Sequence, residues 1–181
     1  RARELKLEPL GYLSGYAYAA FDGRRMGLGP VYATSILLRK LGLAVKQDRA
    51  GNVVVKKPAS PGREAAKSVC LQGHLDMVCE KNAGKVHDFS KDAIELVRKG
   101  NFLMANGTTL GADNGIAVAT NLAVMEDRSL EHGPLEFLFT VDEEMGLNGA
   151  SSLQPGFLKS KMLLNLDSEE EGALYVGCAG G

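Results

Sequence analysis

Short apolar runs that end in polar residues are the most regular pattern along this chain. Residues 68–75, 135–141 and 161–166 are such runs, and an acidic or imidazole side chain lies at or just beyond the end of each. Apolar runs of this length between polar segments are typical of β-strands that are buried in a sheet. We therefore expect three strands that place chemically reactive side chains at their ends.

Apolar residues at helical spacing occur between these runs. Residues 114–125 predict the clearest helix, because alanine is frequent there. Its expected apolar face consists of Ile116, Ala119, Leu122, Ala123 and Val124. Residues 32–41 predict a second helix that Gly42 would end, and residues 146–153 predict a short helix or turn.

Turn residues separate the remaining predicted strands. The segment Asp48-Arg49-Ala50-Gly51 is a hairpin signal between the strand-like residues 43–47 and 52–57. A second hairpin is predicted near residues 94–103, and a last strand at residues 173–176. Strands that alternate with helices indicate an α/β fold with a mixed, largely buried β-sheet flanked by helices.

Composition limits the classes of partner and compartment. The chain has 181 residues, of which 45% are hydrophobic and 24% charged, and its formal net charge is −1. These values are ordinary for a soluble globular protein and give no indication of a nucleic-acid or membrane partner. No segment approaches the roughly 20 apolar residues of a membrane span. The scattered cysteines Cys70, Cys79 and Cys178 indicate free thiols in a reducing compartment, so we expect a cytoplasmic protein.

His74 and Asp76 lie at the end of the first apolar run, in the segment GHLD at residues 73–76. Side chains two positions apart on a strand point to the same face, so Asp76 is placed to orient His74 or the chemistry around it. The alternative is a core histidine beside a capping aspartate.

Asp113 lies between glycines in the segment GADNG at residues 111–115, where the predicted helix begins. One interpretation is that Asp113 or Asn114 is simply the N-cap of that helix. Glycines on both sides of a single carboxylate also favour a close approach of the backbone to a metal or ligand.

Acidic residues follow the other two runs. Asp142, Glu143 and Glu144 follow the second run, and Asp167 follows the third. Adjacent glutamates can take different roles, one as a metal ligand and the other as a proton acceptor. The alternative is a solvated acidic loop.

Other chemistries find little support in the sequence. The segment GTTLGADNG lacks the GK[ST] ending of a phosphate-binding loop, and no GxSxG motif of a serine hydrolase is present. His87 and His132 have no ligand-like context, so we expect both on the surface.

Taken together, these segments resemble the cytosolic aminoacyl-histidine dipeptidases, also called Xaa-His dipeptidases or peptidase D. The resemblance extends from about Leu41 to Gly181 and rests on LQGHLDMV, HDFSKD, NGTTLGADNGIAVA, GPLEFLFTVDEEMGLNGA and LLNLDSEEEGALYVGCAGG. The segments HLD, ADNG and EE are shared with the wider family of co-catalytic di-zinc peptidases. The resemblance implies a partial zinc-peptidase-like catalytic domain at residues 32–181, after an N-terminal segment at residues 1–31 whose role is open. It also implies hydrolysis of dipeptides, preferably Xaa-His.

The resemblance implies a metal-binding role for four residues. His74 and Asp167 would bind one zinc ion, Glu144 would bind a second, and Asp113 would bridge the two. Imidazole and carboxylate ligands suit Zn²⁺, and Co²⁺ or Mn²⁺ could replace it.

Two further residues are implied in catalysis. Glu143 would be the general base for the attacking water, and Asp76 would lie beside His74 and orient it. The resemblance also implies a cis peptide bond between Asp113 and Asn114.

Members of the resembled family are considerably longer, with a second domain and a last zinc-binding histidine near their C-terminus. We therefore expect this chain to lack that domain and that ligand, and to be inactive alone. A small peptide substrate is implied, as is a possible homodimer of the full-length protein. Two alternatives remain open. One is another amide hydrolase of the same family, such as a deacylase or tripeptidase; the other is a non-catalytic fragment that binds a metal or a partner.

Overall fold

The structure, a computed structural model, describes residues 42–168, 170 and 172–177. The predicted loop at residues 1–31 and the predicted helix at residues 32–41 lie outside this part of the chain, as does the predicted boundary between them. None of the helices in the described part has both the length and the apolar character that crossing a membrane requires.

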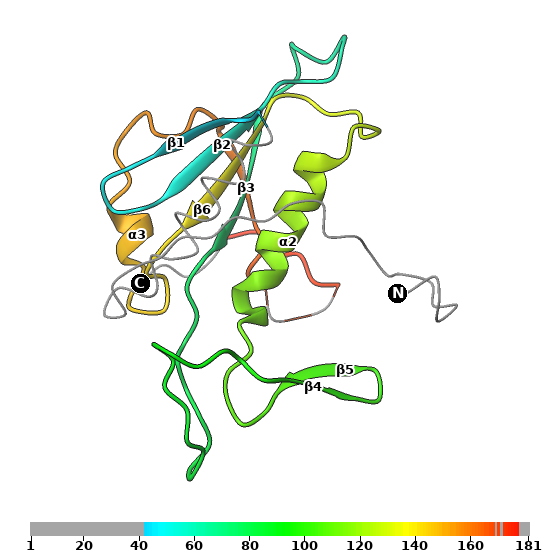
Figure 1. The fold of residues 1–181 in the computed structure, drawn as a ribbon. Helices are drawn as coiled ribbons and strands as arrows, with labels where there is room; N and C mark the ends of the chain where they lie inside the picture. Colours follow the sequence, from blue (N-terminus) through cyan, green and yellow to red (C-terminus); the bar gives the residue numbers. More distant parts are fainter. Residues whose placement is uncertain (1–41, 169, 171, 178–181) are drawn as a thin grey trace.

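A five-stranded mixed β-sheet forms the centre of the fold, in the order β1-β2-β6-β3-β7 (Figure 1). Its strands are β1 (Ala44–Gln47), β2 (Val53–Lys57), β3 (Val69–His74), β6 (Leu135–Thr140) and β7 (Met162–Asn165), and the helices are α2 (Ala112–Glu126) and α3 (Asn148–Ser151). β2 is antiparallel to β1 and to β6, whereas β3 is parallel to both β6 and β7. The predicted mixed α/β fold and its first hairpin are confirmed.

Strand β6 builds a hydrophobic core on each face of the sheet. Phe137 and Phe139 pack into the core on the side of α2. On the other side, Leu138 packs with Cys70 of β3 and with Phe157, which follows α3. Successive side chains of a strand point to opposite faces, so a continuous apolar run is buried on both sides. Figure 1 shows α2 and α3 on opposite sides of the sheet.

The face that helix α2 turns towards the sheet matches the predicted one only in part. Ile116, expected on the buried face, is 67% exposed. The helix instead buries Asn114, Ala117, Asn121 and Met125. Their spacing of three or four residues keeps one face towards the sheet. Leu122 and Val124 of the predicted face do pack against the core. Two of the four buried residues are asparagines, which apolar spacing alone could not place on this face.

A second hairpin lies apart from the sheet, beyond the N-terminal end of α2 (Figure 1). It consists of β4 (Leu96–Lys99) and β5 (Phe102–Ala105), which are antiparallel and form a two-stranded sheet. This confirms the hairpin that the sequence predicted near residues 94–103. All side chains of β4 are exposed, and Phe102 is 74% exposed.

The predicted strand at residues 173–176 is wrong. Residues 173–177 have no regular secondary structure, and Leu174 and Val176 are 83% and 92% exposed. Aromatic and β-branched side chains favour a strand through packing against neighbouring strands. Within the described part of the chain, no strand pairs with these residues.

Candidate metal centre

The ends of three parallel strands bring the predicted side chains to one edge of the sheet. His74 is the last residue of β3, Glu143 follows β6, and Asp167 follows β7. Because β3 lies between β6 and β7 and is parallel to both, the three strands end at the same edge. Asp113 reaches this edge from the first turn of α2, the helix that packs against β3.

His74 is the centre of this cluster. Its side chain is 1% exposed, and its Nε2 atom lies 3.0 Å from Oδ1 of Asp113, 3.7 Å from Oδ2 of Asp167 and 4.0 Å from Oε2 of Glu143. The nitrogen therefore faces carboxylate oxygens from three separate segments. The Asp113 side chain is 73% exposed, so the cluster is open to solvent on that side.

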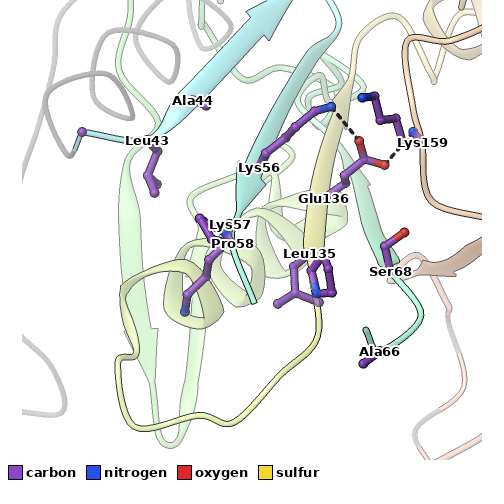
Figure 2. Close-up of a pocket in the computed structure, with 12 residues that line it drawn as sticks. Leu43, Ala44, Lys56, Lys57, Pro58, Ala66, Ser68, Leu135, Glu136 and Lys159 are labelled. Atoms are coloured by element: carbon purple, nitrogen blue, oxygen red, sulfur yellow. Dashed lines mark hydrogen bonds and ion pairs between the residues drawn. The ribbon is translucent and has the colours of Figure 1, made fainter. Parts of the chain in front are cut away.

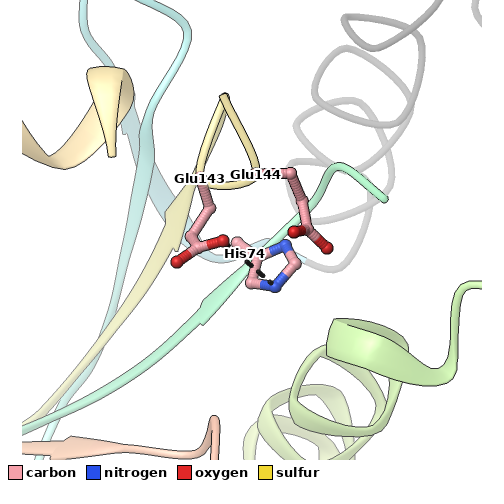
Figure 3. Close-up of side chains that lie close together, drawn as sticks. All are labelled: His74, Glu143 and Glu144. Carbon is pink, nitrogen blue, oxygen red and sulfur yellow. Dashed lines mark ion pairs between the residues drawn. The ribbon is translucent and has the colours of Figure 1, made fainter. Parts of the chain in front are cut away.

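Two groups of side chains in the cluster could each hold a metal ion. One group is His74, Asp113 and Asp167, and the other is His74, Glu143 and Glu144; in each, the ligand atoms lie within 4.8 Å of one another. Figure 3 shows His74 between the carboxylates of Glu143 and Glu144. The first group is the one that the sequence predicted. The second group differs from the predicted ligands of the second ion. The prediction combined Glu144 with Asp113, whereas the structure groups Glu144 with His74 and Glu143.

Asp76 contacts both His74 and the glutamate segment. Nδ1 of His74 donates a hydrogen bond to the backbone carbonyl of Asp76 at 2.8 Å, since a carbonyl oxygen can only accept. Oδ1 of Asp76 lies 3.5 Å from the same nitrogen, and Oδ2 accepts a hydrogen bond from the backbone N–H of Glu144 at 3.1 Å. With Nδ1 protonated, a neutral His74 turns the lone pair of Nε2 towards the carboxylates.

Asp113 and Asn114 form the turn at which α2 begins. The peptide bond between them is cis, as the family resemblance implied. The N-cap residue is Gly111, which has a φ of 82° and makes no side-chain capping bond. The side chain of Asp113 contacts His74, and that of Asn114 bonds to Asp167. Both side chains therefore face the cluster, which does not support the interpretation of either as a helix cap.

Gly73 and Asn114 support the cluster in ways that the sequence did not indicate. A Cβ atom on Gly73 would lie 2.5 Å from the Cβ of Ala117 and 2.5 Å from Oδ1 of Asn114, so only glycine allows β3 and α2 to come this close. Asn114 is 3% exposed, and its Nδ2 donates to Oδ1 of Asp167 at 2.5 Å and to the carbonyl of Leu166 at 3.2 Å. In the sequence, the position of Gly73 directly before His74 was the available signal of this close packing.

Burial and charge shift the pKa values of three cluster residues. Burial lowers the pKa of His74, but the hydrogen bond with Asp113 and the charges of Asp167 and Asp76 outweigh it, so the pKa is raised. Burial raises the pKa of Glu143, and the charges of Asp167 and neighbouring carboxylates raise it further. Burial also raises the pKa of Asp167, with an added contribution from Asp113. Raised carboxyl pKa values bring these groups closer to the range of a general base at neutral pH.

The other described histidines lie outside the cluster. His87 was expected on the surface, but it is 8% exposed and packs edge-on against Phe89, with the ring centroids 4.5 Å apart. The surface prediction for His87 is therefore wrong, because the aromatic ring covers it. His132 is half-buried, with its Nδ1 bonded to the neighbouring carbonyl of Gly133 at 2.7 Å.

Two cavities lie at opposite ends of β6. The larger, about 640 Å³, opens at the beginning of the strand, where Glu136 pairs with Lys56 at 3.3 Å and accepts the backbone N–H of Lys159 at 2.8 Å (Figure 2). The smaller, about 190 Å³, opens beside Glu143 and Asp167. Of these two cavities, the smaller is the one lined by residues of the metal-binding groups.

Comparisons with known proteins find similarity to peptidases. Residues 70–178 match the family described as Peptidase family M20/M25/M40. The chain is 52% identical to the cytosol non-specific dipeptidase of Escherichia coli (strain K12) over 143 residues. This match covers 79% of this chain and 30% of that protein. The crystal structure of aminoacylhistidine dipeptidase from Vibrio alginolyticus is 48% identical with a TM-score of 0.75, and the match covers 78% of this chain and 29% of that one.

A shorter similarity concerns a different kind of protein. Over 46 residues, the chain is 50% identical to a 3-ketoacyl-CoA thiolase of Cronobacter sakazakii (strain ATCC BAA-894). That match covers 25% of this chain and 11% of the thiolase, so it carries no argument about the cluster. The chain spans 30% of the length of the Escherichia coli dipeptidase and 29% of the Vibrio alginolyticus one.

Proposed function

Because this chain belongs to peptidase family M20/M25/M40, we propose that it acts in the metal-dependent hydrolysis of dipeptides, with Xaa-His dipeptides as the preferred class. The observation that carries this proposal is the convergence of Asp113, Asp167, Glu143 and Glu144 on His74 at one edge of the sheet. Both similar proteins are named dipeptidases, which supports dipeptides as substrates, and the name of the Vibrio alginolyticus protein supports the preference for Xaa-His.

The donor atoms of the cluster suit divalent metal ions. Imidazole nitrogen and carboxylate oxygen are the ligands of zinc in hydrolytic sites, and Co²⁺ and Mn²⁺ accept the same donors. His74, Asp113 and Asp167 would hold one ion, and Glu144 would be a ligand of a second. The hydrogen bond from Nδ1 of His74 to the Asp76 carbonyl supports this, because it leaves Nε2 available as a ligand. Bound ions of this kind polarise a peptide carbonyl and make water a better nucleophile at neutral pH.

Glu143 is the proposed general base. It takes a proton from the attacking water at its carboxylate and returns that proton to the departing amine nitrogen, so the same group serves both halves of the reaction. Its raised pKa, caused first by burial, supports this role, because a proton can reside on the carboxyl between the two steps. Asp76 holds the ring of His74 and the backbone of Glu144, and so maintains the geometry around the base.

A cytoplasmic location is part of the proposal. The relative from Escherichia coli is named a cytosol dipeptidase. Cys70 and Cys79 are both free thiols in this chain, and free thiols are typical of a reducing compartment.

A chimeric enzyme tests the function directly. The 143 residues of the Escherichia coli dipeptidase that match this chain would be replaced by the corresponding residues of this chain. The chimera should release histidine from β-Ala-His or Leu-His in the presence of Zn²⁺, Co²⁺ or Mn²⁺. A chimera with His74→Ala serves as the inactive control, and the unmodified dipeptidase as the active one.

The substrate panel separates the proposed activity from its alternatives. Preference for Xaa-His over other dipeptides, tripeptides and N-acyl amino acids supports the proposal. Faster cleavage of a tripeptide or an N-acyl amino acid would favour another amide hydrolase of the family. A chimera that folds and binds metal but cleaves none of these substrates would contradict the proposed function.

A further inference from the structure

Asn52 lies directly before β2, completely buried, and the turn between β1 and β2 fixes its side chain. Oδ1 of Asp48 accepts the backbone N–H groups of Gly51 at 2.8 Å and of Asn52 at 2.9 Å. Oδ2 of Asp48 accepts a hydrogen bond from Nδ2 of Asn52 at 2.7 Å. The hairpin motif found in the sequence therefore does more than reverse the chain, because it holds one buried amide in a defined orientation.

The same amide joins both ends of the segment that carries the two glutamates. Oδ1 of Asn52 accepts the backbone N–H of Val141 at 3.2 Å, and Nδ2 donates to the backbone carbonyl of Gly149 at 2.8 Å. Both hydrogen bonds are buried. Asn52 thus contacts the residue before the segment and the residue after it, although it is 97 positions from Gly149 in the sequence.

Residues 142–148 form a loop that is closed at its base. The N–H of Gly149 donates to the carbonyl of Val141 at 3.1 Å, and a Cβ atom on Gly149 would lie 2.0 Å from that oxygen. Inside the loop, the N–H of Leu147 bonds to the carbonyl of Glu143 at 2.9 Å. The loop is therefore a compact unit, and its position depends on how its base is attached.

Hydrogen bonds from other described segments attach this loop at two places. Asn52 holds the base, and Asp76 accepts the backbone N–H of Glu144. We propose that Asn52 is a positioning residue for Glu143 and Glu144, an inference that rests on the proposed metal site. It touches neither the ion nor the substrate; it fixes the loop base so that both carboxylates face His74.

Hydrogen exchange of the metal-free chain tests the mechanical part of this inference. Asn52→Ala removes both loop bonds, and Asn52→Ser is a milder variant for use if the alanine variant does not fold. Val54→Ala is the matched control, because Val54 is equally buried in the same segment but packs in the core on the far side from α2. We expect the backbone amides of residues 142–148 to exchange at least about tenfold faster in the Asn52 variants than in the wild-type chain. In the control, any increase in exchange should not be confined to these residues.

Cobalt titration of the 181-residue chain tests the connection to the metal site. Asp167→Asn and Glu144→Gln assign the two binding steps to their ligand groups. Glu144→Gln should abolish one of the two binding steps. Asn52→Ala should lower the cobalt affinity of that same step by about 10- to 100-fold, the range for residues that orient metal ligands. It should change the step assigned to Asp167 by less than about threefold. In the Glu144→Gln background, Asn52→Ala should have no further effect on cobalt binding.

The outcomes distinguish this inference from the proposed function. If the wild-type chain binds no cobalt, the proposed metal site fails, and hydrogen exchange alone decides whether Asn52 holds the loop. Equal weakening of both binding steps, or exchange that rises uniformly as in Val54→Ala, would show a merely structural role. Unchanged exchange at residues 142–148 in either Asn52 variant would overturn the inference.

Discussion

His74 receives its orientation from one side and faces carboxylates on the other. The carbonyl of Asp76 fixes Nδ1 as a donor, while Nε2 lies between 3.0 and 4.0 Å from oxygens of Asp113, Asp167 and Glu143. Burial disfavours ionised groups, so gathering several carboxylates around a buried imidazole costs free energy unless positive charge balances the carboxylates. A cation held by these side chains, as proposed above, would supply that balance.

The two adjacent glutamates should respond differently to substitution. In the chimeric dipeptidase, Glu143→Gln should lower kcat by at least about 100-fold, the usual loss for a general base, and leave the metal content near normal. Glu144→Gln should lower the metal content instead. Metal analysis beside steady-state kinetics measures both effects. If Glu143→Gln removes the metal and Glu144→Gln does not, the two roles are reversed.

Metal affinity should fall as the pH is lowered. The pKa values of two proposed ligands, His74 and Asp167, are raised, so both groups hold protons at higher pH than isolated side chains do. An ion must displace those protons, and each proton released steepens the dependence by up to about tenfold in affinity per pH unit. Calorimetric zinc titrations in buffers of different ionisation enthalpy measure the proton release. Affinity that is constant from pH 5.5 to 7.5 would argue against these ligands.

Single residues were predictable only where a local pattern marks them. His74, Asp113, Glu143 and Asp167 each stand at the end of an apolar run or in a glycine-bracketed turn, and the structure gathers them. Asn52 carried no such mark, because its partners lie 89 and 97 positions away in the sequence. Polar residues that act through distant backbone groups become visible only once the fold is known.

At the scale of elements, the close packing of β3 against α2 places the cluster. Gly73 permits this approach, and Asn114 uses it to hold the carboxylate of Asp167. The apolar runs predicted the positions of β3, β6 and β7 correctly, because their length and composition suffice to identify strands. The expected burial holds for β6 but not for β7, whose side chains are all exposed. The failed strand at residues 173–176 has similar local composition, but it lacks a neighbouring strand in the described structure. Local preference therefore identified strands only where tertiary pairing agreed with it.

A pair of glycine substitutions tests this packing. Gly73→Ala should destabilise the fold by about 1–3 kcal/mol, the cost of overpacking, because the new Cβ would collide with Ala117 and Asn114. Gly115→Ala is the matched control: nothing lies within 4 Å of its added Cβ, and in a helix alanine is favoured over glycine by up to about 1 kcal/mol. Urea unfolding measures both. Equal stability of the two variants would show that β3 and α2 are not in tight contact at Gly73.

The whole described fold arranges one end of a mixed sheet for chemistry and leaves other surfaces open. β7 lies at the sheet edge, and its residues Met162, Leu163 and Leu164 are 41%, 50% and 49% exposed. The strand order β1-β2-β6-β3-β7 could not be obtained from the sequence, since apolar patterns identify strands but not their neighbours. That order nevertheless decides the site, because it sets β3 between the two strands whose ends supply Glu143 and Asp167.

Zinc titration of the 181-residue chain, with His74→Ala and His132→Ala measured beside it, tests the central claim most directly. His132 supplies a matched control, because it lies outside both metal-binding groups. The wild-type chain and His132→Ala should bind zinc at about micromolar concentrations or below. His74→Ala should remain folded by circular dichroism and lose affinity by at least about 100-fold, more than substitutions of residues that only orient ligands. Equal zinc binding by the folded His74→Ala variant and the wild-type chain would contradict a metal centre built on His74.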